Sequence, residues 1–341
     1  MPTLFPLHIS LESFNVAVTD RSRVGPSDRH VARCLHLLQS RAMLRRCLST
    51  APRSAPLRTL LAGFVPPENA GSTLTGSIAP SWMQGATTFG RCSAGLCLLG
   101  AQHVLEDPAM PLRSANVDFV GAAGGDVTIQ ATTIRKGKNS SIVRADVIGE
   151  KGLATTATFT FANERASALE ARNFVPPPPS DLPPPHACQT LQDALGVQPP
   201  QFFEHFELRI ATRGQVDATG GAASNWMWVR HAEANGSTGG VDGVDAAVAL
   251  VALADTPPPA IVILLTGSGA IDKFPNVSSL TWHVNFVDRT PTPAHDGGWW
   301  LIEQRIEHLR GGFSSCDMAL WGGDTSRGPV LVSRQAIAVY A

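Results

Sequence analysis

The chain has 341 residues, of which 43% are apolar and 16% are charged, and its formal net charge is −1. This composition is that of a globular protein, and the length suits two domains of about 150 residues each. The balanced charge argues against a nucleic acid as the main partner. The longest strongly apolar run, "VDAAVALVALAD", has about half the length of a membrane span, so we expect no membrane-spanning segment.

The first 56 residues have an unusual charge pattern. Between Arg29 and Pro67 there are seven arginines and no acidic residue. The stretch "SRAMLRRCLSTAPRSAPLR" is rich in Arg and Ser, as mitochondrial transit peptides are. We therefore predict that residues 1–56 form a targeting or disordered extension. The predicted location is mitochondrial, with a cytoplasmic location as the alternative.

Residues 57–172 read as one helix followed by several strands. The segment 87–106 is apolar nearly all round and contains many small residues, which predicts a buried helix. The stretch "PLRSANVDFVG" (111–121) predicts a strand, and the strands after it are separated by glycine-containing turns such as "RKGKN". The last strand of this half ends near Phe161.

A proline-rich segment, 173–186, divides the chain. It has seven prolines between Pro176 and Pro185. Because proline cannot donate a backbone hydrogen bond, the segment predicts an extended connector and not a helix or strand. We expect it to link a first unit, 57–172, to a second unit, 187–341.

The second unit repeats the pattern of the first. A helix is predicted over 243–255, where "TPPP" ends it, and the strand "SSLTWHVNFVD" (278–288) again contains V-[DN]-F-V. From Val117 to Phe161 there are 45 residues, and from Val284 to Tyr340 there are 57. The extra residues fall in loops, where insertions cost little, so the two units are predicted to be a duplication.

Each unit is thus predicted to be one buried helix wrapped by an antiparallel sheet. Two such units in tandem give an α+β fold, the double hot-dog fold. The edges of such sheets can pair with a second copy, so a homo-oligomer is expected. The six cysteines include no C-x-x-C pair, which excludes a disulfide scaffold and indicates a reducing compartment.

Three motifs resemble those of the type II acyl-CoA thioesterases: "WMQGATTFG", "LTWHVNF" and "IEQRIEHLRGGFSSCDMALW…LVSRQAIAVYA". The resemblance covers about residues 57–341. It implies hydrolysis of a small-molecule acyl-CoA substrate to a free acid and CoA, without a metal or redox cofactor. It also implies a catalytic set of Asp255, Ser279 and Gln335. The family has Thr where Ser279 stands, and Thr281, two residues further along the strand, is a possible substitute.

These residue types suit thioester chemistry. The leaving thiolate has a conjugate acid with a pKa of about 8–9, so no strong general acid is needed. Asp255 can accept a proton from water, while Ser279 and Gln335 fix its position. We expect backbone N–H groups near Gly90 or Gly240 to receive the developing negative charge. His283 is interpreted as a strand residue and not as a base.

The phosphates of CoA need donors, which basic residues at the repeat-equivalent turns can supply. The candidates are Arg135, Lys136, Lys138 and Arg310.

Three other functions are considered. A covalent serine hydrolase is disfavoured because "IVILLTGSGA" has no glycine two residues before Ser268. An enoyl-CoA hydratase-like enzyme is disfavoured because Asp242 and Asp245 have no following histidine. A non-catalytic acyl-CoA or acyl-binding protein stays open.

Overall fold

The structure is a computed structural model that describes residues 55–68, 71–169, 175–195, 200–212, 224–262, 276–288 and 291–340. The predicted N-terminal extension lies outside the described residues up to position 54. The mitochondrial and cytoplasmic alternatives therefore stay predictions. In the described part, no helix is both long and apolar enough to cross a membrane.

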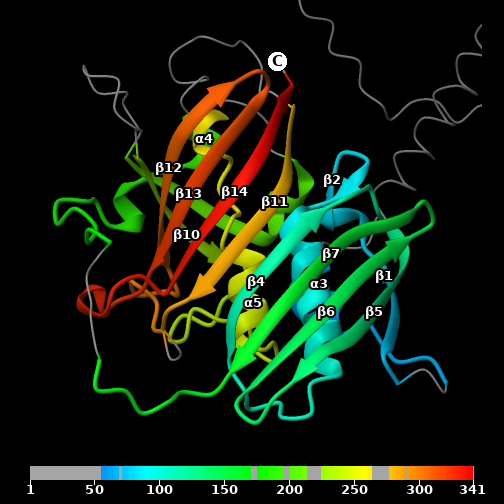
Figure 1. Cartoon of the computed structure of the whole chain (residues 1–341). Coiled ribbons are helices and arrows are strands. Elements are labelled where there is room, and N and C mark those ends of the chain that lie inside the picture. The colour runs from blue at the N-terminus through cyan, green and yellow to red at the C-terminus, as the bar shows by residue number, and fades with distance from the viewer. Residues whose placement is uncertain are drawn as a thin grey trace, which may run out of the picture. The chain divides into compact units, whose positions relative to one another are not determined.

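One antiparallel sheet of twelve strands forms most of the molecule (Figure 1), in the order β1-β5-β6-β7-β4-β11-β14-β13-β12-β10-β9-β8. The first unit supplies β1 (Thr73–Ile78), β4 (Leu112–Phe119), β5 (Gly125–Lys136), β6 (Ser140–Gly149) and β7 (Gly152–Ala162). The second supplies β8 (Gln189–Thr190), β9 (Phe206–Thr212), β10 (Ser224–His231), β11 (Asn276–Phe286), β12 (Trp300–Arg310), β13 (Phe313–Trp321) and β14 (Leu331–Tyr340). The edge strands of this sheet are β1 and β8. The expected homo-oligomer stays a prediction.

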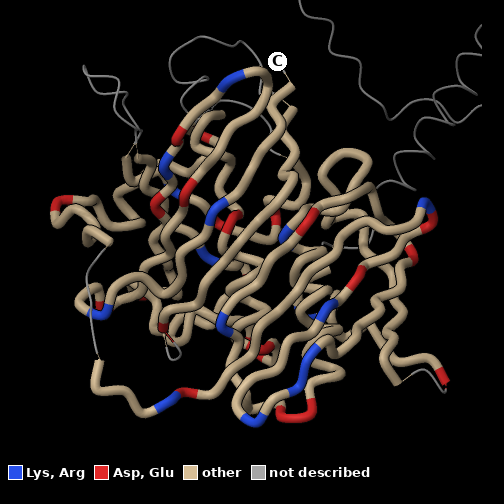
Figure 2. Tube along the Cα trace, in the orientation of Figure 1, with Lys and Arg blue, Asp and Glu red and all other residues tan. Residues whose placement is uncertain are grey.

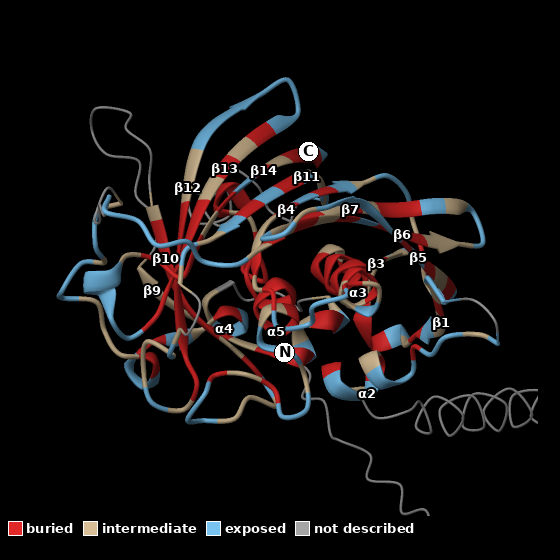
Figure 3. Cartoon of the chain, turned by 60° about the horizontal axis from the view of Figure 1, so that its bottom comes forward, coloured by how far each residue is buried: buried red, intermediate tan, exposed pale blue. Residues whose placement is uncertain are grey.

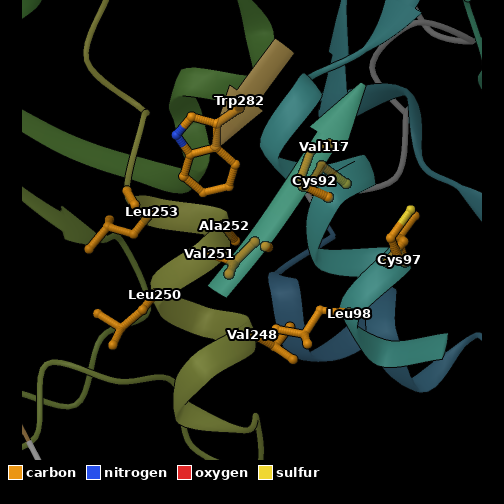
Figure 4. Close-up of a cluster of buried hydrophobic side chains, with 14 of the residues drawn as sticks. Cys92, Cys97, Leu98, Val117, Val248, Leu250, Val251, Ala252, Leu253 and Trp282 are labelled. Carbon is orange, nitrogen blue, oxygen red and sulfur yellow. The ribbon is translucent and has the colours of Figure 1, made fainter. Parts of the chain in front are cut away.

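Two buried helices lie under the sheet, one for each unit (Figure 3). They are α3 (Gly90–His103) and α5 (Ala246–Leu253), and they pack against each other. Figure 4 shows how Leu98 of α3 meets Val248 of α5 in the shared core. The predicted double hot-dog architecture is thus confirmed. Helix α3 starts later than predicted, because Thr87–Thr88 form β3 and pair with β2 (Met83–Gln84).

The remaining elements are short. They are the helices α2 (Leu57–Ala62) and α4 (Leu191–Leu195) and the 3₁₀ turns η1 (Pro80–Trp82), η2 (Pro185–Ala187), η3 (Gln201–His205) and η4 (Thr325–Arg327).

The two strands that share V-[DN]-F-V lie side by side at the centre of the sheet. Strand β4 pairs with β11 in antiparallel register, with Val117 opposite Trp282 and Asn116 opposite His283. The ring of His283 contacts Asn116 Oδ1 through Nδ1 at 2.5 Å and Asn285 Nδ2 through Nε2 at 2.9 Å. The ring is exposed, and both of its nitrogens have hydrogen-bond partners on the sheet. This agrees with the interpretation of His283 as a strand residue and not as a base. We call the β4–β11 pairing the central seam.

The described part of the proline-rich segment covers the outer face of the second unit. Val175 and Leu182 pack against a second apolar cluster that includes Trp226, Trp228 and Trp321. The indole N–H of Trp228 donates to the carbonyl oxygen of Pro183 at 2.8 Å. Since that carbonyl has no strand partner, the tryptophan satisfies it. The described part of the segment contains no strand or α-helix before the 3₁₀ turn η2, and it packs over β10, β12 and β13.

Two glycines of α3 give a matched test of its packing. A Cβ on Gly100 would lie 2.4 Å from Ile129 Cγ2, whereas a Cβ on Gly95 would make ordinary contacts of 3.8 and 3.9 Å with α5. Alanine is favoured over glycine in a helix by about 1 kcal/mol. We therefore expect Gly95→Ala to raise the free energy of unfolding by up to about 1 kcal/mol. Gly100→Ala should lower it by about 1–2 kcal/mol, because overpacking outweighs that gain.

Denaturant unfolding measures both values, and each glycine is the control for the other. Equal stabilisation by the two alanines would contradict the close approach of α3 to β5 at Gly100.

The buried His231 is expected to lower the free energy of unfolding in acid. Its Nε2 contacts the carbonyl oxygen of Ala249 in α5 at 2.9 Å, and burial lowers its pKa to about 4 from 6.5. Between these two values the unfolded chain binds the proton and the folded chain does not. Stability is therefore complete above pH 6.5 and falls toward pH 4, by on the order of 3 kcal/mol from this ring. Burial likewise lowers the pKa of His205 to about 4.

The check is the free energy of unfolding against pH in His231→Gln, whose amide N–H can replace the bond to Ala249. The slope between pH 6.5 and 4 should become shallower but not vanish, because His205 remains. His103→Gln, at an exposed position that ends α3, is the control and should keep the full slope. An unchanged slope in His231→Gln would refute the assignment.

Candidate active site

Asp255 lies just beyond the C-terminal end of α5. The helix ends at Leu253, Thr256 Oγ1 donates to the Leu253 carbonyl oxygen at 2.7 Å, and the prolines 257–259 prevent continuation. Only 8% of Asp255 is exposed. A buried carboxylate beside the negative end of a helix is electrostatically unfavourable, so it needs donors and a counter-charge.

Gln335 and Ser279 supply part of that environment. Gln335 Nε2 donates to Asp255 Oδ1 at 2.9 Å, and Ser279 Oγ donates to Gln335 Oε1 at 3.2 Å. Gln335 is buried on β14 and Ser279 is half-buried on β11, and these two strands are neighbours. The structure therefore brings together the three residues singled out in the sequence.

A fourth residue, Arg91, belongs to the same network and was missed by the sequence reasoning. Its Nη2 donates to Asp255 Oδ2 and, at 2.7 Å, to Gln335 Oε1. Arg91 comes from the first turn of α3, is 1% exposed, and lies near the rings of Phe119 (5.0 Å) and Trp282 (4.3 Å). Burial lowers the pKa of its guanidinium well below its usual value. The available signal was a lone arginine in a helix predicted to be apolar all round.

These side chains open onto a cavity of about 600 Å³ between the two units. Its walls are the start of α3, the end of β4 with residues 120–123, the start of β11, and Tyr340. The β2–β3 hairpin contributes Gln84, Gly85 and Thr87 at its rim. Arg91, Asp255 and Ser279 all line it. In Figure 1 this region lies where β4 ends and β11 begins.

A smaller pocket of about 60 Å³ adjoins the cavity and shares Asp255 and Ser279 with it. Its other walls are mostly aromatic and proline side chains, namely Phe89, Pro200, Phe202, Phe203, Pro257, Pro258 and Pro259. An apolar pocket beside a polar cluster suits a ligand that has an apolar chain attached to a polar reacting group.

Thr281 does not join the cluster. The register between β11 and β14 shifts between Ser279 and Thr281, so Leu280 is an extra residue in β11. Such a bulge reverses the alternation of side chains that follows it. Ser279 and the buried Trp282 therefore face the interior, while Thr281 is exposed on the outer face. The expectation that Thr281 could stand in for Ser279 is wrong for this reason.

The two helix-start glycines also differ. Gly90 is the first residue of α3 and lines the cavity, next to the ring of Phe119. Gly240 lies in a turn before α5, where its carbonyl oxygen accepts from Asn235 N at 2.8 Å, and it is not a lining residue. Helix α5 begins later, with Asp245 as its N-cap. The structure thus places Gly90, but not Gly240, at the site.

The basic turns are repeat-equivalent but lie at opposite ends of the sheet. Strand β5 begins at Gly125, two residues after Ala123 of the cavity wall, and runs twelve residues to Lys136, which is about 36 Å. Arg135, Lys136 and Lys138 are exposed at that far end, and Lys136 pairs with Glu106. These three residues do not line the cavity, because antiparallel pairing of β4 with β11 turns the two units head to tail. Their predicted contact with the substrate is therefore not supported by their position.

Arg310 has a different position. It is opposite Phe313 at the β12–β13 turn, and Phe313 pairs with Ala338, two residues before Tyr340 of the cavity wall. Arg310 is exposed and does not line the cavity. Figure 2 shows blue segments at both the β12–β13 and the β5–β6 turns, at the top and bottom of the view. Of the four basic residues, Arg310 alone lies at the cavity end.

Comparison with solved structures identifies the architecture. A hot-dog protein of unknown function from Alicyclobacillus acidocaldarius aligns with TM-score 0.66 and 18% identity, covering 83% of this chain and 98% of its own. A putative thioesterase II from Thermobifida fusca aligns with TM-score 0.61 and 18% identity, over 82% and 95% of the two chains. An acyl-CoA thioesterase II, TesB2, from Mycobacterium marinum aligns with TM-score 0.58 and 16% identity, over 83% and 98%.

At these identities the likeness establishes the fold, a tandem pair of hot-dog units. The sequence itself matches two family patterns. The acyl-CoA thioesterase N-terminal domain matches residues 78–162, and the acyl-CoA thioesterase C-terminal domain matches residues 179–339. The chain therefore belongs to the acyl-CoA thioesterase family. A comparison with curated proteins finds no match.

Proposed function

We propose that the protein hydrolyses acyl-CoA thioesters to a free acid and CoA, with Asp255 as the general base. The observation that supports this most directly is the hydrogen-bonded set of Asp255, Gln335 and Ser279, of which Asp255 and Ser279 line a large cavity. Because the chain belongs to the acyl-CoA thioesterase family, we infer that the cavity binds the thioester and that these side chains hold a water molecule next to it. The proposal uses no metal or redox cofactor.

The hydrogen bonds assign a role to each side chain. Gln335 donates its amide N–H to Asp255 and accepts from Ser279, so its orientation is fixed from two sides. Among the described residues, each oxygen of Asp255 has one hydrogen-bond partner and keeps a second lone pair, which can accept a proton from water. A general base held in this way contributes about 10²–10⁴-fold. Ser279 lines the cavity and can hold the water through its hydroxyl.

The adjoining apolar pocket supports an acyl chain as the part of the substrate next to the reacting carbon. Its aromatic and proline walls meet Asp255 and Ser279 directly. Arg310 is the remaining candidate for the phosphates of CoA, which would extend over the rim toward the β12–β13 turn.

The test is a thiol-release screen of the purified protein over acyl-CoA substrates from acetyl to palmitoyl. We expect CoA release with at least one chain length. If no substrate releases CoA while calorimetry detects acyl-CoA binding, the non-catalytic acyl-CoA-binding function replaces this proposal. Hydration of an enoyl-CoA without CoA release would instead favour the hydratase.

A further inference from the structure

Arg91 has hydrogen-bonding capacity that its protein partners do not use. A guanidinium has five N–H donors, and in the described part of the chain only Nη2 has partners. Nε and Nη1 are buried without a partner there. Leaving a buried donor unsatisfied costs about 1–3 kcal/mol, and more when it is charged. An ion pair with Asp255 therefore does not by itself account for an arginine at this position.

The helix ends reinforce the charge pattern of the site. Arg91 is in the first turn of α3, where the positive end of the helix dipole adds to the guanidinium charge. Asp255 follows the last turn of α5, where the negative end adds to the carboxylate. Each charge is thus unfavourable at its own helix end and is compensated by the other. The result is a positive and a negative pole side by side on one cavity wall.

A thioester undergoing hydrolysis needs both poles. Water gives up a proton on one side of the carbonyl carbon, and negative charge develops on the carbonyl oxygen. Asp255 suits the first event. The positive pole suits the second, and its unused N–H groups are the donors that an oxyanion requires.

We propose that Arg91 is a buried oxyanion subsite, whose free N–H groups bind the thioester carbonyl oxygen and then the carboxylate of the released acid. This inference rests on the proposed function. It adds a side chain to the backbone N–H groups near Gly90 that the sequence predicts to receive the negative charge. Arg91 and Gly90 are consecutive, so the side chain and the helix start act at the same place.

The water oxygen bonds to the carbonyl carbon, Asp255 takes a water proton, and the carbonyl oxygen becomes the oxyanion at Arg91. The oxyanion then collapses and the carbon–sulfur bond breaks. The CoA thiolate leaves and takes up the proton held by Asp255. The acid ionises and its carboxylate stays at Arg91 until it is released.

The first test compares Arg91→Met with Arg91→Lys in the full-length protein. Methionine keeps apolar bulk between Phe119 and Trp282, and lysine keeps the charge but not the planar fork. We expect kcat to fall about 10²–10³-fold in Arg91→Met, with KM changed less than threefold, because the interaction strengthens in the transition state. Arg91→Lys should lose less. A kcat for Arg91→Met within twofold of the wild type would overturn the proposal.

The second test uses ligand charge and does not depend on activity. Octanoate and octanamide have the same chain, and calorimetry or competitive inhibition gives the affinity of each. The wild type should prefer octanoate, and the ratio of the two affinities should fall at least tenfold in Arg91→Met. A variant whose fold is loosened would bind both ligands more weakly and leave this ratio unchanged. An unchanged ratio would therefore contradict the subsite.

If Arg91→Met does not fold, because Asp255 is left unpaired, the variant Arg91→Met with Asp255→Asn removes both charges. We expect it to bind octanoate no better than octanamide, and a retained preference for octanoate would refute the proposal. The failures are distinguishable. If the wild type has no thioesterase activity but shows an Arg91-dependent preference for octanoate, the proposed function is refuted and the anion subsite is supported.

Discussion

Asp255→Asn is expected to lower kcat by about 10²–10⁴-fold, because the amide cannot accept a proton from water. The substitution preserves shape, so the hydrogen bond from Gln335 Nε2 to Oδ1 can persist. It also leaves the Arg91 guanidinium buried without a counter-charge, which should reduce the free energy of unfolding by about 3–5 kcal/mol. Rates must therefore be measured below the unfolding transition, with circular dichroism recorded on the same samples.

Asp245→Asn is the matched control, because Asp245 caps the opposite end of α5. Its Oδ1 accepts from the backbone N–H groups of Ala247 and Val248, and asparagine caps helices equally well. We expect its kcat to equal that of the wild type. Asp255→Glu keeps the carboxylate and should recover part of the rate. Full activity in folded Asp255→Asn would exclude Asp255 as the base.

Trp282→Ala is expected to lower the free energy of unfolding by about 3–5 kcal/mol, the usual range for deleting a buried aromatic ring. Trp282 is 1% exposed on the central seam, opposite Val117 on β4 and Gln335 on β14. Figure 4 shows it beside the buried side chains of α5. Its ring also lies 4.3 Å from the Arg91 guanidinium, so we expect activity to fall as well.

Trp282→Phe is the control for this change. The indole N–H has no hydrogen-bond partner in the described part of the chain, so phenylalanine loses volume but no bond. Its cost should be clearly smaller than that of alanine in the same urea titration. Equal losses for the two variants would mean that the ring does not support the site through packing.

The repeat made most of the fold predictable. Strands β4 and β11 are specified locally, by alternating apolar residues, glycine turns and the shared V-[DN]-F-V motif. Because the two units are a duplication, the fold predicted for one unit also applies to the other. The orientation of the two units is a long-range property. It follows from edge-to-edge pairing of β4 with β11, which no local pattern encodes. That is why the basic turn at Arg135 was expected at the wrong end of the sheet.

The candidate site was predictable to the extent that family motifs carry it. Gln335 stands in such a motif, Ser279 directly precedes another, and Asp255 ends the second predicted helix; the structure places the three within hydrogen-bonding distance. Arg91 was missed because its partner is 164 positions away in the chain. Thr281 was misplaced because a single extra residue, Leu280, changes which face of β11 a side chain occupies.

The central seam has a further consequence for how the protein behaves on dilution. The cavity takes Arg91 from one unit and Asp255 from the other, and both units belong to one polypeptide joined across residues 163–188. Bringing them together is a unimolecular event, so its equilibrium carries no concentration term. Specific activity should hold constant down to nanomolar protein. It should fall only if β1 or β8 of a neighbouring copy also shapes the cavity.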